Sequence, residues 1–198
     1  MDVSDDKDKG TLDREMRLNQ LYLAIISRYR EYIEEKEHIS VAELPTMVLP
    51  KNQRVLGKAE EIKSSFGMYS YKSHFYEASI NAFYFVKKNV DDVVMPLQFW
   101  LTPEDTLNFG VGDLLDRNVL LCSLMIALGN PSAKVLVHII GGTRRVFTYY
   151  EFEGHAYMLD FSSGFKKFEN RDALIKSLGI DDETIAYEFN DKMYVEIS

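Results

Sequence analysis

The sequence predicts an α+β fold in which one apolar helix packs against an antiparallel β-sheet. Helix-like patterns fill the first part of the chain and strand-like patterns the second, and short turns join consecutive strands, which favours antiparallel pairing. The central helix is the clearest element. Gly110 and Gly112 allow a tight turn, Asp113 can cap the free N–H groups, and an unbroken apolar run continues to Gly129. With 46% hydrophobic residues in a chain of 198, a core of considerable size can be buried.

The N-terminal part is expected to be a tail followed by a helical extension. Residues 1–10 are acidic and nearly free of apolar side chains, so we expect a disordered acidic tail. Apolar residues then recur at helical spacing over residues 12–37, which predicts an amphipathic helix; they are Leu18, Leu21, Tyr22, Ile25, Ile26, Tyr29 and Ile33. The apolar face of this helix can pack on the domain's own core or serve self-association. On this pattern, residues 11–72 form the extension and residues 73–198 the main domain.

Four further helices are predicted before the central one. The first is short and has capping-box spacing from Ser40 to Glu43, and residues 52–65 form the second. Ser73 opens the next, which runs to Lys88, and its inner face is expected to be Phe75, Ala78, Ser79, Ala82, Phe83 and Val86. Thr102 and Pro103 begin the last, with threonine as the cap and proline at the first helical position.

Strands dominate the rest of the chain. Residues 133–140 are a continuous apolar run typical of a buried strand, and residues 146–153 and 155–161 follow as a hairpin around Glu153 and Gly154. A short helix is expected over residues 172–178, and the last hairpin joins residues 185–189 to residues 193–197.

Charge and composition exclude several functional classes. The formal net charge is −8, which disfavours general binding to a nucleic-acid backbone. The longest apolar run, residues 119–128, is too short to span a membrane. The single cysteine cannot form an internal disulfide and fits a reducing compartment, so we expect a cytoplasmic protein. His38, His74 and His138 lack metal-ligand spacing and are expected to be satisfied structural histidines, so no metal or cofactor is expected.

The segment around the central helix resembles the transglutaminase-like (papain-like) cysteine enzyme superfamily. That family's pattern reads G-D-C-x-D-x-x-x-L-L, followed by an apolar run and A-L-G, and residues 112–129 read GDLLDRNVLLCSLMIALG. Leu114 therefore stands at the position of the catalytic cysteine. The resemblance covers roughly residues 75–165, including the lead-in that contains Trp100, and it implies a transglutaminase-like core with an N-terminal helical extension.

The same resemblance assigns the other two catalytic positions. Setting MLDF (residues 158–161) on the family's V-L-D-P makes Asp160 the aspartate, and counting back along two strands puts Arg145 at the histidine position. Leucine has no nucleophilic atom and arginine stays protonated, so neither can do the family's chemistry. We expect Arg145 and Asp160 to form an ion pair.

A second register remains open. Residues 154–157 (GHAY) also resemble the family's G-H-A-W, which would make His155 the histidine, although the match at residues 158–161 is then lost. Cys122 lies more than two turns into the helix among leucines, so we expect it to be buried and unreactive.

Two functional classes follow. The first is a catalytically inactive domain, a pseudoenzyme, that binds a peptide or protein, with Arg145 suited to an anionic group. The second is a hydrolase or acyl transferase with a different site that uses His155 and Asp160. We favour the first, because no other nucleophile, metal cluster or phosphate loop replaces the missing residues. The candidate residues for the binding cleft are Arg145, Asp160, His155, Asp113 and Trp100.

Overall fold

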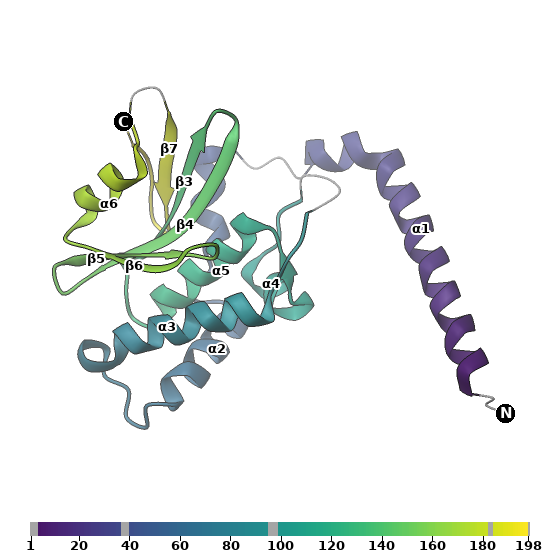
Figure 1. The fold of residues 1–198 in the computed structure, drawn as a ribbon, viewed down its shortest axis with the longest axis horizontal. Helices are drawn as coiled ribbons and strands as arrows, with labels where there is room; N and C mark the ends of the chain where they lie inside the picture. Colours follow the sequence, from purple (N-terminus) through teal and green to yellow (C-terminus); the bar gives the residue numbers. More distant parts are fainter. Residues whose placement is uncertain (1–3, 37–39, 95–98, 182–183, 198) are drawn as a thin grey trace. The chain divides into compact units, whose positions relative to one another are not determined.

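The computed structural model describes residues 4–36, 40–94, 99–181 and 184–197. They separate into two compact units, which are treated one at a time. The smaller unit contains the long helix α1 (Ser4–Lys36), and the larger contains the other helices and all the strands (Figure 1). No helix within the described ranges is both long and apolar enough to cross a membrane.

The predicted amphipathic helix is present as α1, but it begins earlier than expected. Residues 4–10 are helical, whereas the sequence predicts a disordered tail there. A shortage of apolar residues therefore does not prevent this segment from being helical. Which surface the apolar face of α1 meets stays a prediction.

The larger unit has helices first and strands afterwards, as predicted. Its elements are η1 (Val41–Met47), α2 (Gln53–Ser64), α3 (Tyr71–Asn89), β1 (Asp91–Asp92), α4 (Pro103–Phe109), β2 (Val111–Gly112), α5 (Leu114–Ala127), β3 (Lys134–Ile140), β4 (Thr143–Phe152), β5 (His155–Asp160), β6 (Gly164–Phe168), α6 (Arg171–Leu178), β7 (Ile185–Phe189) and β8 (Tyr194–Ile197). Six strands form one sheet in the order β6-β5-β4-β3-β7-β8, and every pair in it is antiparallel. The predicted α+β class is confirmed.

The sheet is covered on both faces. On one face β4 and β5 place Val146, Tyr150 and Leu159 in the main core together with α5, α2 and α3. On the other face Phe147 and Met158 meet α6 in a smaller core. Figure 1 shows α5 and α3 on one side of the sheet and α6 on the opposite side. Because side chains alternate along a strand, odd and even positions of β4 belong to different cores.

The start of the compact unit differs from the expected boundary at residue 73. Helix α2 buries Val55, Ala59 and Ile62 in the same core as α5. Residues 40–72 thus pack with the main domain and are not a separate extension. The sequence pattern could not reveal this, because an amphipathic helix looks the same whether its apolar face meets a distant or a nearby part of the chain.

Several local predictions are confirmed by the caps and inner faces of the helices. The side chain of Asp113 accepts hydrogen bonds from the backbone N–H groups of Leu115 and Asp116, and Thr102 caps α4 with Pro103 in its first turn. The buried residues of α3 are the six predicted ones. Strand β6 was not predicted. Its sequence, GFKKF, is short and carries two lysines, a composition that suits an edge strand but gives little strand signal.

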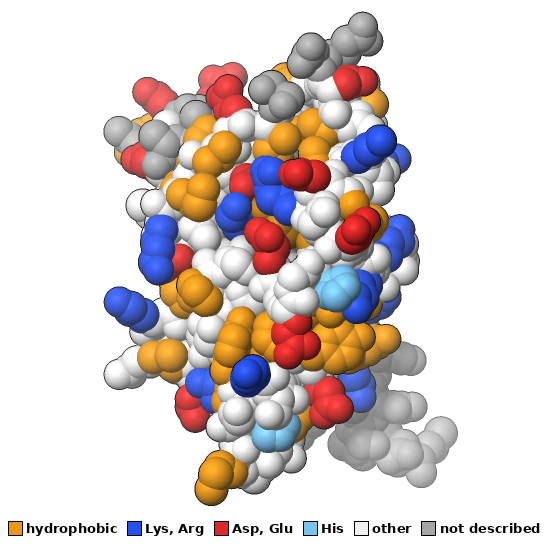
Figure 2. All heavy atoms as spheres, turned by 90° about the vertical axis from the view of Figure 1, so that its left-hand side faces the viewer, with side chains coloured by type: hydrophobic (Ala, Val, Ile, Leu, Met, Phe, Trp, Pro, Cys, Tyr) orange, Lys and Arg blue, Asp and Glu red, His pale blue; other side chains and the backbone are white. Residues whose placement is uncertain are grey.

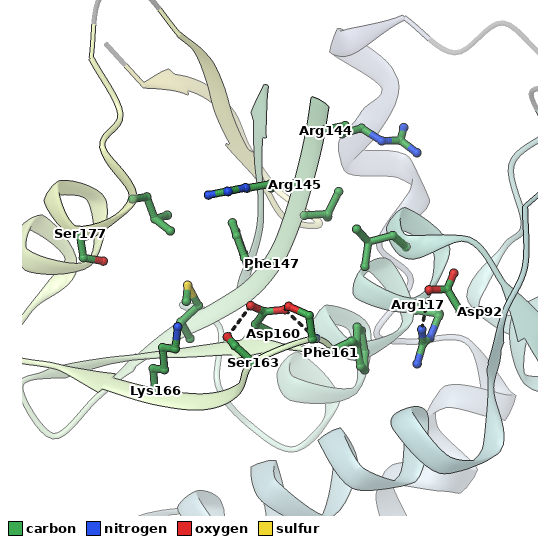
Figure 3. A pocket seen from close by; sticks show the side chains of 15 residues that line it. Asp92, Arg117, Arg144, Arg145, Phe147, Asp160, Phe161, Ser163, Lys166 and Ser177 are labelled. Carbon is green, nitrogen blue, oxygen red and sulfur yellow. Dashed lines mark hydrogen bonds and ion pairs between the residues drawn. The ribbon is translucent and has the colours of Figure 1, made fainter. Parts of the chain in front are cut away.

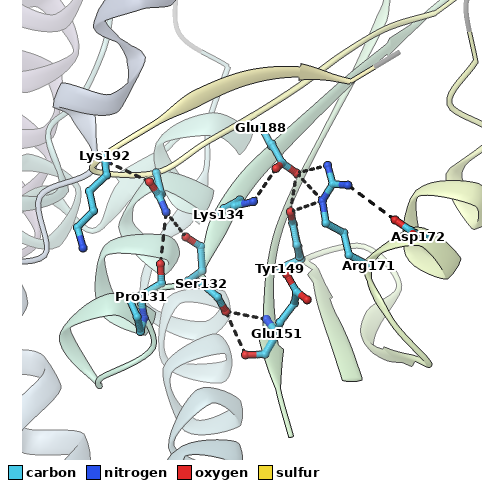
Figure 4. Close-up of polar contacts among 11 residues, drawn as sticks. Pro131, Ser132, Lys134, Tyr149, Glu151, Arg171, Asp172, Glu188 and Lys192 are labelled. Atoms are coloured by element: carbon cyan, nitrogen blue, oxygen red, sulfur yellow. Dashed lines mark hydrogen bonds and ion pairs between the residues drawn. The ribbon is translucent and has the colours of Figure 1, made fainter. Parts of the chain in front are cut away.

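A buried ionic cluster joins α6 to the sheet (Figure 4). Glu188 on β7 is 2% exposed and accepts hydrogen bonds from Lys134 Nζ at 2.6 Å and Arg171 Nη2 at 3.0 Å, and from the hydroxyl of Tyr149. Burial raises the pKa of Glu188, but the hydrogen bonds from Lys134 and Tyr149 outweigh it, so the pKa lies below its usual value. Arg171 is the first residue of α6, so the cluster anchors the beginning of that helix.

Replacing Glu188 should destabilise the domain strongly. Glu188→Ala leaves Lys134 and Arg171 without their shared carboxylate in a buried site. We expect the free energy of unfolding to fall by about 3–5 kcal/mol. Urea denaturation measures this loss, with the exposed glutamate variant Glu169→Ala as the matched control that should change little. In the wild-type protein, ionised Glu188 contributes its full stabilisation when the pH is above 4.5, the ordinary pKa of glutamate. This stabilisation is lost as the pH falls below 4.5 toward the lowered pKa of Glu188 in the folded protein. Equal stability of the two variants would contradict the role of the cluster.

Candidate functional site

Leu114 is the first residue of α5, which is where the resemblance to cysteine enzymes locates the nucleophile. Asp113 is the N-cap and completes a capping box with Asp116. Leu114 is half-buried, whereas every residue from Leu115 to Met125 is buried. The helix start therefore presents the leucine side chain to a cavity, and the apolar run behind it holds the helix in the core.

A pocket of about 580 Å³ lies beside this helix start. Its described lining comes from β1, α5, β4, β5, the segment after β5, β6 and α6; the residues are Asp92, Leu114, Arg117, Arg144, Arg145, Val146, Phe147, Met158, Asp160, Phe161, Ser162, Ser163, Lys166, Ser177 and Leu178. The three positions that the resemblance assigns, Leu114, Arg145 and Asp160, all contribute to it. The three residues thus lie around one pocket, and its role as a functional site stays a prediction.

Arg145 and Asp160 do not form the expected ion pair. No carboxylate within the described ranges forms an ion pair with Arg145, which is exposed and lies opposite His138 on β3. Figure 3 shows the Arg145 and Asp160 side chains apart, with Phe147 between them. The predicted ion pair is wrong because of the register between β4 and β5. Leu159 lies opposite Thr148, so Asp160 at the end of β5 lies beside residues of β4 that come after Arg145.

Asp160 instead organises the turn that follows it. Its carboxylate accepts hydrogen bonds from Ser162 N at 2.8 Å, Ser162 Oγ at 2.7 Å and Ser163 Oγ at 2.5 Å. Burial raises the pKa of Asp160, but the hydrogen bonds from Ser163 and Ser162 outweigh this effect and lower it overall. The carboxylate is therefore ionised, and its hydrogen bonds are made to the serines of the turn. It lines the pocket, but its lowered pKa makes it a poor base.

The arginine that faces the start of α5 is Arg144. Alternation along β4 directs Arg144 and Val146 to the α5 side of the sheet and Arg145 and Phe147 to the α6 side. Arg144 Nη2 lies 2.9 Å from Asp113 Oδ2 and so joins β4 to the cap of α5. The sequence instead predicts this role for the neighbouring Arg145, because a spacing counted along two strands does not determine which face a residue occupies.

His155 lies far from the pocket. It is the first residue of β5 and Asp160 is the last, so they are separated by roughly 16 Å at about 3.3 Å per residue. The Nδ1 atom of His155 contacts the carbonyl oxygen of Glu153 at 3.0 Å in the hairpin turn. A catalytic site that uses both residues is therefore not formed, and the register that makes His155 the catalytic histidine does not bring it to Leu114.

Two other cleft candidates have structural roles. Trp100 packs against the main hydrophobic core and is not among the residues that line the pocket. Asp113 caps α5 and pairs with Arg144. Asp116 is buried next to it, and burial together with the charge of Asp113 raises the pKa of Asp116 to about 7. The two acids thus support the helix start and do not point to a ligand.

The remaining reactive side chains also lie outside the pocket. Cys122 is fully buried, and burial raises the pKa of its thiol, as predicted. His138 is buried, but neither ring nitrogen has a hydrogen-bond partner among the described residues, so the expectation of a satisfied histidine is wrong for it. Burial and the charge of Arg145 lower the pKa of His138, which keeps its ring neutral. His38 lies outside the described residues.

Comparison with known proteins gives the fold and nothing finer. No protein-family model and no curated protein sequence matches the chain. Two similar solved structures are of LapG from Legionella pneumophila. The EGTA-treated form is 13% identical, with a TM-score of 0.51, and the match covers 81% of this chain and 87% of that one. The other structure is 15% identical, with a TM-score of 0.50 and coverage of 80% and 88%.

This likeness confirms the predicted fold class. LapG has a papain-like fold, and the arrangement of α5 against an antiparallel sheet fits a transglutaminase-like core. At these identities the likeness gives no information on the chemistry of the site.

The corrected pairing can be checked with two double-mutant cycles. Arg144→Met with Asp113→Ala should show a coupling energy of about 0.2–1 kcal/mol, because the two side chains touch in a partly exposed ion pair. Arg145→Met with Asp160→Ala should be additive within about 0.5 kcal/mol. Unfolding free energies of the single and double variants give both numbers. Strong coupling between Arg145 and Asp160 would restore the original pairing and contradict the contacts described above.

Proposed function

We propose that this chain is a catalytically inactive transglutaminase-like domain whose pocket at the start of α5 binds a segment of a peptide or protein. Leu114 is the observation that carries the proposal. It is the first residue of α5, it lines the pocket, and the resemblance sets it at the position of the cysteine nucleophile. A leucine cannot attack a carbonyl group, so a bound peptide would not be cleaved or transferred by that route.

The form of the pocket supports a peptide ligand. In Figure 3 the labelled side chains extend from Ser177 on α6 to Asp92 near the start of α5, which favours an elongated ligand. Apolar side chains such as Phe147 and Phe161 alternate with charged and hydroxyl groups along this length. A peptide in an extended conformation offers apolar and polar side chains together with backbone groups, and it can match such a lining.

The charge of the pocket supports an anionic group on that ligand. Arg145 is exposed, and no carboxylate within the described ranges neutralises it through an ion pair. Lys166 also lines the pocket. Figure 2 views the side of the molecule on which α6 lies, and it shows basic and acidic side chains interspersed with hydrophobic ones. This mixture suits recognition of a particular segment more than general attraction of any anion.

A screen with a blocked variant tests peptide binding. Ser177→Trp should fill the α6 end of the pocket, and Lys176→Trp places the same ring on the neighbouring exposed residue, which does not line it. Peptides are selected from a random library on the wild-type protein, and their affinity for Ser177→Trp should be lower by at least about tenfold. This is the change expected when one peptide side chain can no longer be buried in the pocket. They should bind normally to Lys176→Trp. Peptides that bind both variants equally, or that are cleaved, would refute the proposal.

A cysteine introduced at Leu114 tests the nature of the site. In Leu114→Cys the thiol lies at a helix N-terminus near Arg144, and both features should lower its pKa, whereas the buried Cys122 thiol has a raised pKa. Mass spectrometry after alkylation at pH 7 should find the new thiol labelled at least about tenfold faster than Cys122. Hydrolysis of peptides should remain undetectable, because no imidazole lines the pocket within the described part of the chain. Restored turnover, or equal slow labelling, would contradict this view.

A further inference from the structure

Arg117 is a buried cation within the wall of the same pocket. It lies one turn into α5 and is only 6% exposed. Arginine is rarely buried to this extent unless its charge is paired and its N–H groups are bonded. The guanidinium lies over the ring of Phe161, with 4.3 Å between Cζ and the ring centroid. The side chain is thus fixed in position by packing.

The charge of Arg117 is only partly compensated. Its ion pair with Asp92 is long, 3.4 Å from Nη1 to Oδ2, and the Asp92 side chain is 63% exposed. The Nε atom is buried and has no hydrogen-bond partner in the part of the chain that the structure describes. Burial lowers the pKa of Arg117, and the charges of Asp92 and Asp91 oppose that shift. A buried guanidinium whose charge is only partly compensated is unfavourable, so an anion from outside the chain that reaches its terminal nitrogens would be bound well.

The surroundings of Arg117 add to this effect. The described lining of the pocket holds four cations, Arg117, Arg144, Arg145 and Lys166, and only two carboxylates, Asp92 and Asp160. Asp160 is already bonded to the serines of its turn. The pocket is therefore locally positive in a chain whose net charge is −8.

We propose that Arg117 binds the terminal carboxylate of the peptide that occupies the pocket. The inference rests on the proposed peptide-binding function and names the group that is recognised. Figure 3 shows Arg117 and Asp92 at one end of the row of lining side chains, where an extended ligand would end. The two terminal nitrogens of a planar guanidinium form paired hydrogen bonds to the two oxygens of a carboxylate. An internal acidic side chain offers similar oxygens, and the experiment separates these two sources.

The main test compares free and blocked peptide ends. A peptide from the library screen is synthesised with a free C-terminal carboxylate, with a C-terminal amide, and as an amide with an internal glutamate. Amidation should weaken binding to the wild-type protein by about tenfold to hundredfold, which is the effect of losing hydrogen bonds to a charged group. Arg117→Met should weaken the free acid by the same factor and leave the amide unchanged. Arg54→Met, which removes an exposed arginine outside the pocket, should alter neither affinity.

Stability measurements separate binding from a structural role. If Arg117 is retained for a ligand, Arg117→Met should melt at the same temperature as the wild-type protein or higher, because a poorly compensated buried charge is removed. Arg117→Lys should keep the charge and recover only part of the affinity, since it lacks the planar fork. A lower melting temperature for Arg117→Met, with equal losses of affinity for acid and amide, would overturn the inference and show that the residue supports the fold.

The outcomes also distinguish this inference from the proposed function. If peptides bind but Arg117→Met and amidation have no effect, the function stands and the role of Arg117 fails. If no peptide binds, acetate and inorganic phosphate are titrated while the Nε–H signal of Arg117 is followed by NMR. A saturable shift of this signal that Arg145→Met does not abolish would show an anion site at Arg117 without the peptide-binding function. The absence of any shift would reject both the anion site and the peptide-binding function. Stronger binding of the internal-glutamate amide than of the free acid would overturn recognition of the chain end.

Discussion

The burial of α5 on all sides is the constraint on which the rest of the domain depends. From Leu115 to Met125 each residue is buried, although several of them are polar. Each polar group therefore needs a partner from a neighbouring segment. Asp116 accepts from the N–H of Leu101, Asn118 bonds to β4 through the carbonyl of Val146 and the hydroxyl of Thr148, and Ser123 accepts from the N–H of Leu49. Through these bonds the helix aligns the segment before α4, the strand β4 and the loop after η1.

The parts of the fold that were predictable are those determined by nearby residues. Caps such as Asp113 and Thr102, the inner face of α3, and the hairpin turn at Glu153 and Gly154 depend on residues within one or two turns of each other, so spacing alone reveals them. The three positions that the resemblance assigns, Leu114, Arg145 and Asp160, line one pocket, and its role as a functional site stays a prediction.

The details of the site were not predictable, for two physical reasons. The sheet is buried on both faces, so odd and even residues of β4 are both apolar and alternation does not show which set faces α5. Arg145 was therefore chosen where Arg144 makes the contact with the helix cap. The other reason is distance along the chain. Lys134 and Glu188 bond across a separation of 54 residues, and no local pattern relates them. The unbonded Nε of Arg117 is likewise visible only once its neighbours are in place.

The described lining of the pocket contains no thiol and no imidazole, and this determines how the pocket responds to pH. A thiol and an imidazole exchange a proton near neutral pH, so the charge of a cysteine enzyme site varies over the physiological range. Here three of the four cations in the described lining are guanidiniums, which stay protonated wherever a protein is folded, and the Asp160 carboxyl has a lowered pKa. The pocket consequently has an almost constant electrostatic potential from mildly acidic to mildly alkaline conditions, so the affinity of the anion site proposed above should not follow the acidity of its compartment.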